Sequence, residues 1–285
     1  DGHHIFLNGK PIYLRGDMCH IHWPGTISPP TERKEIKEKM QLFVDYGFNF
    51  IRHHTHFPGI EFMDVCDELG ILNSNGVNVV ENSMIIFEEH RETLWQKLIE
   101  RDRNHPSAII WSMGNERVPS PELIKKYSDL TFDVDKTRLL ATNSPGWFVT
   151  PEGQQYRMNI YHEFRQPGGS YIDQDFKENF DTSLLRPWRV LYTEENLEKA
   201  GFDSLFPVFT KNTELLQGRC RKILLEQARL QHEELNGSWN IPGIHYVGYQ
   251  LATFRDAGSF MWGVVDDYFN PKIVPPHEMI RYNAP

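Results

Sequence analysis

The stretch RNHPSAIIWSMGNE, residues 103–116, decides the fold. A helical pattern ends before a Pro-containing turn, and the apolar run AIIWSMG follows at 108–114. This run brings Asn115 and Glu116 to its end. An apolar segment that ends in polar and ionisable residues is typical of a buried parallel strand whose carboxyl end opens into a site. The stretch therefore predicts both a kind of sheet and a place for chemistry.

Eight segments of the chain have the composition of such strands. They are residues 13–18, 48–53, 70–74, 108–114, 138–143, 157–162, 189–194 and 258–265. Amphipathic helical patterns lie between them, at 31–46, 60–69, 87–103, 121–135 and 213–235. Gly47 and Gly70 follow the first two and fit as helix ends. The alternation predicts an α/β protein with a (β/α)8 TIM barrel, in which chemistry lies on loops at the carboxyl ends of the strands.

The first residues predict a β-hairpin ahead of the barrel. The apolar run at 5–7 is followed by Asn8-Gly9 and then by a second apolar run. Asn-Gly is the preferred pair for a two-residue turn, because both central positions need a positive φ. We expect one domain over residues 1–285, with residues 1–12 as a leading hairpin or linker.

Composition excludes several classes of protein. The 285 residues carry 30 Lys and Arg against 39 Asp and Glu, which gives a net charge of −9. A nucleic-acid binder presents a basic surface, and docking on an anionic membrane needs one too, so neither partner is expected. No apolar run approaches the ~18 residues that span a bilayer. Cys19, Cys66 and Cys220 have no zinc-binding spacing, and we expect neither a metal nor another cofactor.

Residues 103–116 resemble the signature of glycoside hydrolase family 2, in which RDRNHPS…WS.GNE carries the acid/base glutamate. Residues 6–16, 47–52, 64–71 and 258–263 are similar to other segments of the same family. The resemblance implies a TIM barrel of the β-galactosidase or β-glucuronidase type. It also implies a retaining, exo-acting glycosidase, which cleaves a terminal sugar by double displacement through a covalent glycosyl-enzyme.

The resemblance makes Glu116 the acid/base and places the nucleophile at the end of the seventh strand, in RVLYTEEN at 189–196. A retaining enzyme needs its two carboxyl groups about 5–5.5 Å apart. In the family the nucleophile directly follows a small hydroxyl residue, which selects Glu194 after Thr193. Glu195 is the alternative, because successive strand residues point to opposite faces and one of the two faces the barrel axis.

The resemblance also implies a set of substrate-binding residues. Arg52 would contact the nucleophile, Tyr161 would hydrogen-bond to it, and Asn115 would hold the sugar 2-hydroxyl. The remaining candidates, which would contact the sugar itself, are His20, His54 or His56, His162 and Trp262. The alternatives without function are a surface salt bridge for Arg52 and a core position for Tyr161. The crowded histidines at 20–22 and 53–56 have a metal site as their alternative, since imidazoles bind Zn and Ni.

Two departures from the family pattern support a different hypothesis. Glu195-Asn196 replaces the usual aromatic and glycine after the nucleophile, and residues 73–78 replace a Gln-x-Glu-x-Pro-like run on the rim after the third strand. A catalytically inactive, carbohydrate-binding barrel of the same fold is therefore the second hypothesis. The sequence does not identify the sugar that is cleaved. Asn270-Pro271-Lys272 resembles the Asn-x-Lys pair of glucuronidases, with a shorter spacing.

Partners follow from the resemblance as well. The substrate would be an oligosaccharide or glycoside. Family members carry β-sandwich domains before the barrel, and residues 1–10 read like chain arriving from such a domain. The chain also begins with Asp1 rather than Met. We therefore expect it to be the catalytic portion of a longer protein. An oligomer, and either a periplasmic or secreted or a cytoplasmic location, are compatible with the sequence.

Overall fold

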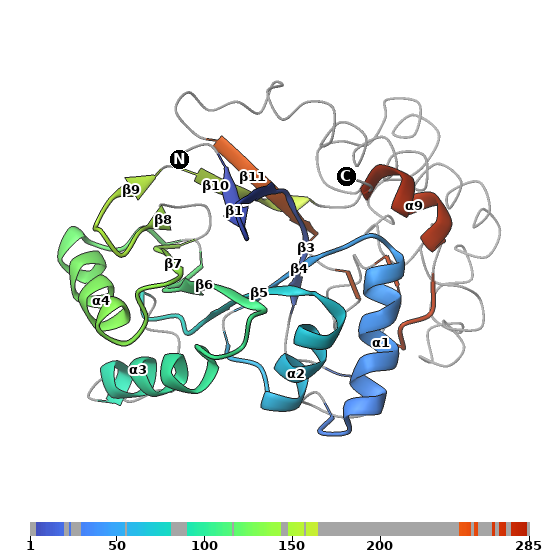
Figure 1. Cartoon of the computed structure of the whole chain (residues 1–285), viewed down its shortest axis with the longest axis horizontal. Coiled ribbons are helices and arrows are strands. Elements are labelled where there is room, and N and C mark those ends of the chain that lie inside the picture. The colour runs from blue at the N-terminus through green and yellow to red at the C-terminus, as the bar shows by residue number, and fades with distance from the viewer. Residues whose placement is uncertain are drawn as a thin grey trace, which may run out of the picture.

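The computed structural model describes most of the first 164 residues and several segments near the end of the chain. The described residues are 4–19, 23, 30–54, 56–80, 90–115, 117–143, 148–156, 158–164, 245–251, 254–255, 264–265, 268–271 and 275–283. From β3 to β7 strands and helices alternate, and the strands form a curved sheet with helices on its outer side (Figure 1).

Nine of the described strands form one sheet, in the order β10-β11-β3-β4-β5-β6-β7-β8-β9. The run from β10 to β7 is parallel, and β8 and β9 extend it as an antiparallel pair beyond β7. The bounds are β3 Leu14–Cys19, β4 Phe50–His53, β5 Leu72–Gly76, β6 Ala108–Ser112, β7 Leu139–Ala141, β8 Phe148–Val149, β9 Gln155–Tyr156, β10 Met158–Phe164 and β11 His245–Leu251. Because the strands are parallel, their carboxyl ends meet at one edge.

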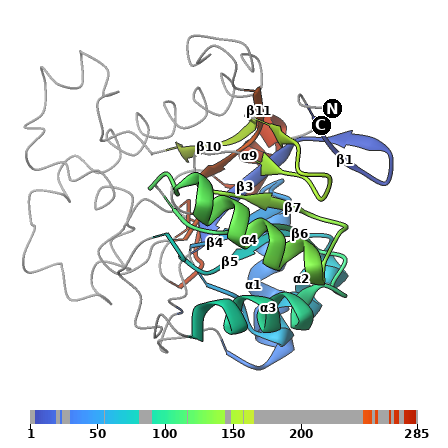
Figure 2. The same cartoon turned by 90° about the vertical axis from the view of Figure 1, so that its left-hand side faces the viewer.

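Four helices cover the outer face of this sheet (Figure 2). They are α1 Arg33–Asp45, α2 Ile60–Leu69, α3 Arg91–Asp102 and α4 Pro121–Val134, and a later helix, α9 Pro276–Asn283, packs on α1. Gly70 ends α2 in the left-handed conformation with φ 71°, as expected for a C-terminal glycine. Among the described helices, none is both long and apolar enough to cross a bilayer.

Buried side chains divide into an inner and an outer set. Strand residues such as Leu14, Phe50 and Leu72 form a cluster with no helical member, so it fills the inside of the curve. Ile51 instead packs with side chains of α1 and α2, between sheet and helices. Neighbouring strand residues point to opposite faces. Because Phe50 points inward and Ile51 points toward the helices, the direction of the other side chains of β4 follows from them.

The predicted hairpin is present. Strands β1 Ile5–Leu7 and β2 Lys10–Ile12 pair antiparallel, and their turn has φ 52° at Asn8 and φ 77° at Gly9. These are the positive angles that an Asn-Gly turn supplies.

The predicted elements up to residue 164 are confirmed, with ends shifted by a few residues. The helix predicted at 87–103 is found at Arg91–Asp102. Strand β5 is displaced as a whole, from the predicted 70–74 to Leu72–Gly76. Residues 73–76, interpreted as part of a rebuilt rim, are therefore buried strand, and this interpretation was wrong. The antiparallel pair β8 and β9 and the helix α9 were not predicted.

The neighbour of the first barrel strand differs from the prediction. In a closed eight-stranded barrel the eighth strand, predicted at 258–265, would lie beside β3, but β11 occupies that place and pairs with both β3 and β10. Gly248 makes the position possible, because a Cβ there would lie 2.3 Å from the carbonyl oxygen of Leu14. Of the predicted eighth strand, Val264 and Val265 are described, and Val265 forms isolated bridges. The predicted strand at 189–194 and helix at 213–235 lie outside the described residues.

Candidate active site

Arg52 points into the barrel from the carboxyl end of β4. It shares its face with Phe50, whereas Ile51 and His53 face the helices. The ring of His53 lies 5.5 Å from that of Phe62 on α2, which agrees with this outward facing. Arg52 is only 3% exposed. The alternative of a surface salt bridge for Arg52 was therefore wrong.

The guanidinium of Arg52 reaches past β5 to the segment that follows β6. Its Nη2 donates to Oδ1 of Asn115 at 2.8 Å and, at 3.4 Å, to the carbonyl oxygen of Gly114. Asn115 directly precedes Glu116 in the sequence. A buried arginine thus contacts the chain next to the predicted acid/base, at the strand ends where the fold predicts chemistry.

His54 joins the same group. Its backbone N–H donates to the carbonyl oxygen of Cys19 at 3.0 Å, and its side chain hydrogen-bonds to Asn115. Burial, together with the nearby charge of Arg52, lowers the pKa of His54 to about 4, so its ring is neutral at neutral pH. We call Arg52, His54 and Asn115 the carboxyl-edge cluster.

The other predicted site residues fall into three groups. His56 is half-buried, and its ring packs edge-on against His53 at 5.1 Å. Tyr161 and His162 lie on β10, where the backbone is described and the side chains are not. The residues that lie outside the described ranges are His20, Glu116, Glu194, its alternative Glu195, and Trp262.

A buried polar pair behind the carboxyl-edge cluster was not predicted. Nε2 of His53 lies 2.9 Å from Oδ1 of Asn73 on the neighbouring strand β5. The sequence offered one signal for it. Asn73 and Asn75 are alternate residues of a predicted buried strand and therefore share one face, where apolar residues are the rule.

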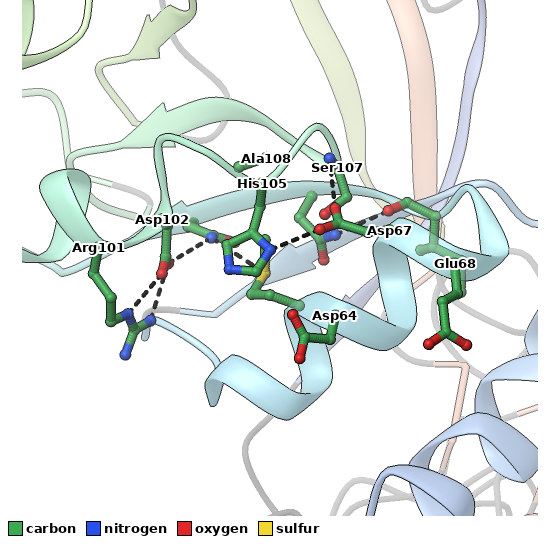
Figure 3. A network of polar contacts seen from close by, with 12 residues as sticks. Asp64, Asp67, Glu68, Arg101, Asp102, His105, Ser107 and Ala108 are labelled. Carbon is green, nitrogen blue, oxygen red and sulfur yellow. Dashed lines mark hydrogen bonds and ion pairs between the residues drawn. The ribbon is translucent and has the colours of Figure 1, made fainter.

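A second polar network lies at the opposite, amino edge of the sheet (Figure 3). Asp67, in the last turn of α2, accepts a hydrogen bond from the backbone N–H of Ser107 at 2.9 Å and lies 2.7 Å from Nδ1 of His105. The carbonyl oxygen of Ser107 accepts from the N–H of Asn73 at 2.7 Å, near the start of β5. We call Asp67, His105 and Ser107 the amino-edge network.

Two members of the amino-edge network, Asp67 and His105, form a group of metal-ligand types with Asp64 in the described part of the chain. Ligand atoms of Asp64, Asp67 and His105 lie within 4.8 Å of one another. However, both oxygens of Asp67 already take part in hydrogen bonds to His105 and Ser107. The geometry is therefore that of a structural tie between α2 and the loop before β6.

The parallel strands with outer helices, and the polar cluster at their carboxyl edge, define a TIM barrel domain. The family whose description reads "Glycosyl hydrolases family 2, TIM barrel domain" matches residues 1–235. The chain belongs to this family of glycosidases, as its resemblance at 103–116 predicted.

Curated relatives agree with this assignment. Over 121 residues the chain is 32% identical to a β-galactosidase of Photobacterium profundum, a match that covers 39% of this chain and 12% of that protein. A β-galactosidase of Thermoanaerobacter pseudethanolicus is 26% identical over 148 residues, or 47% of this chain and 18% of the relative. The matches therefore cover less than a fifth of these curated relatives.

The fold of the whole chain is similar to that of a β-glucuronidase from Ruminococcus gnavus, solved in complex with uronic deoxynojirimycin. The TM-score is 0.63 at 16% identity, over 99% of this chain and 52% of that one. An exo-chitosanase from Amycolatopsis orientalis gives 0.60 at 17% identity, over 98% and 38% of the two chains. At these identities the likeness concerns the fold alone.

Proposed function

We propose that the chain forms the catalytic barrel of a retaining, exo-acting glycoside hydrolase that removes a terminal sugar of the β-galactoside or β-glucuronide type. Glu116 is the acid/base and Glu194 the nucleophile. The observation that supports this proposal most is the 2.8 Å hydrogen bond between buried Arg52 and Asn115, the residue before Glu116. Family membership supports the reaction type, and the names of the relatives support the two sugar classes.

The reaction has two steps. In the first, a carboxylate oxygen of Glu194 bonds to the anomeric carbon while the glycosidic bond breaks, and Glu116 gives its proton to the leaving oxygen. In the second, Glu116 takes a proton from water, the water oxygen bonds to the anomeric carbon, and the bond to Glu194 breaks. The sugar therefore leaves with its original anomeric configuration.

The carboxyl-edge cluster suits both steps. A buried guanidinium favours the ionised form of a nearby carboxyl group, so Arg52 would keep the nucleophile charged. The amide oxygen of Asn115 accepts from Arg52, which orients the amide. Its nitrogen is then the group that would donate to the sugar 2-hydroxyl, a contact that strengthens in the transition state. His54, which is neutral, adds a hydrogen-bonding side chain without a second positive charge.

The proposal is tested by mutation of both carboxylates. Glu116→Gln and Glu194→Gln should each abolish turnover of aryl glycosides with ordinary leaving groups. With an activated leaving group the first step needs no proton, and azide, an anion that attacks the glycosyl-enzyme without a general base, should restore turnover to Glu116→Gln with glycosyl azide as the product. Glu195→Gln is the matched control and should retain activity. Turnover that persists in both Glu116→Gln and Glu194→Gln would refute the assignment.

A panel of aryl galactosides, glucuronides, mannosides and arabinosides identifies the sugar in the same experiment. Calorimetric binding of an oligosaccharide by the wild-type protein, with no sugar released on long incubation, would favour the second hypothesis of an inactive, carbohydrate-binding barrel. The altered residues Glu195 and Asn196 are the reason to make this measurement.

A further inference from the structure

The layer between β4, β5 and α2 contains a polar pair in an apolar setting. His53 is 1% exposed and Asn73 is fully buried, and both face helix α2, where Phe62, Val65 and Cys66 are buried too. A buried polar group costs free energy unless it is hydrogen-bonded. The 2.9 Å contact between His53 Nε2 and Asn73 Oδ1 supplies that bond. The buried Nε2 of His53 and the buried Oδ1 of Asn73 therefore satisfy each other's hydrogen bonding.

The contacts of Asn73 fix the state of His53. Asn73 Nδ2 donates to the carbonyl oxygen of Ile71 at 2.9 Å, which orients the amide and leaves Oδ1 as the group that faces His53. Since Oδ1 can only accept, Nε2 of His53 bears the proton. Nδ1 of His53 is buried and has no hydrogen-bond partner among the described residues. The ring is thus held through one nitrogen, as the Nε2–H tautomer.

His53 is also held in its neutral form. Burial, and then the nearby His56, lower the pKa of His53 well below its usual value. The other titratable or charged groups near it are Arg52 and His54 on its own segment, its register partner Cys19 on β3, and Cys66 on α2. A protonated His53 would add a second buried cation directly after Arg52, at a Coulombic cost.

We propose that His53 and Asn73 are a positioning pair, which holds Arg52 and His56 in place for the sugar. His53 links the end of β4 to β5 through Asn73, and the alternation of the strand then directs Arg52 toward Asn115. The same ring packs edge-on against His56 at 5.1 Å. This inference rests on the proposed function, because it assigns the pair a part in the reaction at the carboxyl edge.

The test removes the acceptor and keeps the volume. Asn73→Leu should lower kcat on an aryl glycoside by about tenfold to a hundredfold, the usual result of a small misplacement near reacting groups. KM should change much less. Asn73→Asp, which keeps an acceptor at the same position, should recover most of the lost kcat. All variants are compared at a temperature where circular dichroism shows them folded.

A matched control separates positioning from structure. Asn75 lies on the same face of β5, two residues further on, and its Nδ2 donates to Asp102 of α3 at 3.1 Å. Asn73, by contrast, is bonded to His53 of β4 through its Oδ1. Asn75→Leu should destabilise the fold and leave kcat of the folded enzyme unchanged. If Asn73→Leu keeps the wild-type kcat, or if Asn75→Leu lowers kcat equally, the positioning role is wrong.

A spectroscopic readout tests the pair without activity. Nitrogen–proton correlation spectra should show His53 as the neutral Nε2–H tautomer in the wild-type protein, and this signal should change in Asn73→Leu but persist in Asn75→Leu. Any other tautomer in the wild type would refute the inference.

Failure of this inference is distinguishable from failure of the proposed function. If Glu116→Gln loses turnover while Asn73→Leu keeps it, the pair has no positioning role and the proposed function stands. If Glu116→Gln keeps turnover while Asn73→Leu loses it, the assignment of the acid/base is wrong and the pair still acts on the active edge.

Discussion

The two edges of the parallel sheet hold charged groups of opposite sign. At the amino edge, the carboxylate of Asp67 is matched by the N–H of Ser107 and by His105, and the three groups connect α2 to the loop before β6. At the carboxyl edge, buried Arg52 donates to the neutral oxygens of Asn115 and Gly114. His54 beside it is kept neutral by burial and by Arg52.

This difference separates stability from chemistry. A carboxylate matched by its donors holds two elements together and gains nothing from a ligand. A buried cation stabilises an anion close to it, such as an ionised nucleophile or the carboxylate of a uronic acid. In TIM barrels the amino face contributes stability and the carboxyl face contributes catalysis. We expect the two edges of this chain to follow that division, and each prediction below tests one side of it.

Among the substitutions that compare the two edges, Arg52→Met should have the largest effect. Loss of the cation should lower kcat/KM by about 10²–10³-fold, as for other groups that stabilise charge in a transition state. The melting temperature should move by only a few degrees, because Met fills the site without leaving a buried charge. Turnover and thermal unfolding of the same preparation measure both. Wild-type turnover in Arg52→Met would place the chemistry elsewhere.

Asp67→Ala should have the reverse effect. It leaves the N–H of Ser107 without its acceptor and removes a charged hydrogen-bond partner, so we expect a loss of about 2–3 kcal/mol in the free energy of unfolding. Turnover per folded molecule should stay near wild type. Urea unfolding and active-site titration give the two quantities. A large fall in the turnover of the folded fraction would contradict the division between the edges.

The pH dependence of stability should report on the histidines of the carboxyl edge. The pKa of His54 falls from 6.5 to about 4 on folding, so between these values the unfolded chain binds more protons than the folded one. This contribution to stability is present above pH 6.5 and is lost as the pH falls toward 4. His53 acts in the same direction. Urea unfolding across this window should show a shallower slope for His54→Gln than for wild type.

Asp17 changes the pH dependence of stability in the opposite direction. The slope of the wild-type protein therefore combines both effects, and the His54→Gln variant is needed to separate them. It lies on β3, accepts the backbone N–H of Phe254, and has its pKa raised by burial to about 7. Its contribution to stability is present below pH 3.8 and is lost as the pH rises through 7. Asp17→Asn should remove this loss of stability at rising pH. If the dependence of stability on pH is the same in that variant as in wild type, the raised pKa of Asp17 is wrong.

The smallest effect should come from Asp64→Ala, the control for Asp67. Asp64 lies on the same helix and its side chain is 36% exposed, where it pairs with the exposed Arg33. Exposed ion pairs contribute about 0–1 kcal/mol. Neither urea unfolding nor turnover should change much. A loss as large as that in Asp67→Ala would mean that the amino-edge network extends to Asp64.

Sequence patterns predicted what depends on local chemistry. The helices at 60–69 and 121–135 and the Asn8-Gly9 turn follow from periodicity, a glycine end and positive φ, and all three are confirmed. The place of β11 was not predicted, because it depends on the close approach of Gly248 to Leu14, which a single strand does not encode.

The sequence predicted some residues of the candidate site and missed others. Arg52 and Asn115 each end a predicted strand, so their meeting at one edge follows from the fold. The pair of His53 and Asn73 was missed, because each residue alone is an ordinary polar residue and only the register of β4 with β5 brings them together. The tie between Asp67 and His105 was also missed, because only the packing of α2 against the loop before β6 brings them together.

The most direct test of the account is covalent labelling by a 2-deoxy-2-fluoro aryl glycoside of the preferred sugar, followed by peptide mass spectrometry. The account predicts one sugar per chain, attached to Glu194. Labelling should be much slower in Arg52→Met and as fast as wild type in folded Asp67→Ala. A label on another residue, or a slow rate in Asp67→Ala equal to that in Arg52→Met, would contradict it.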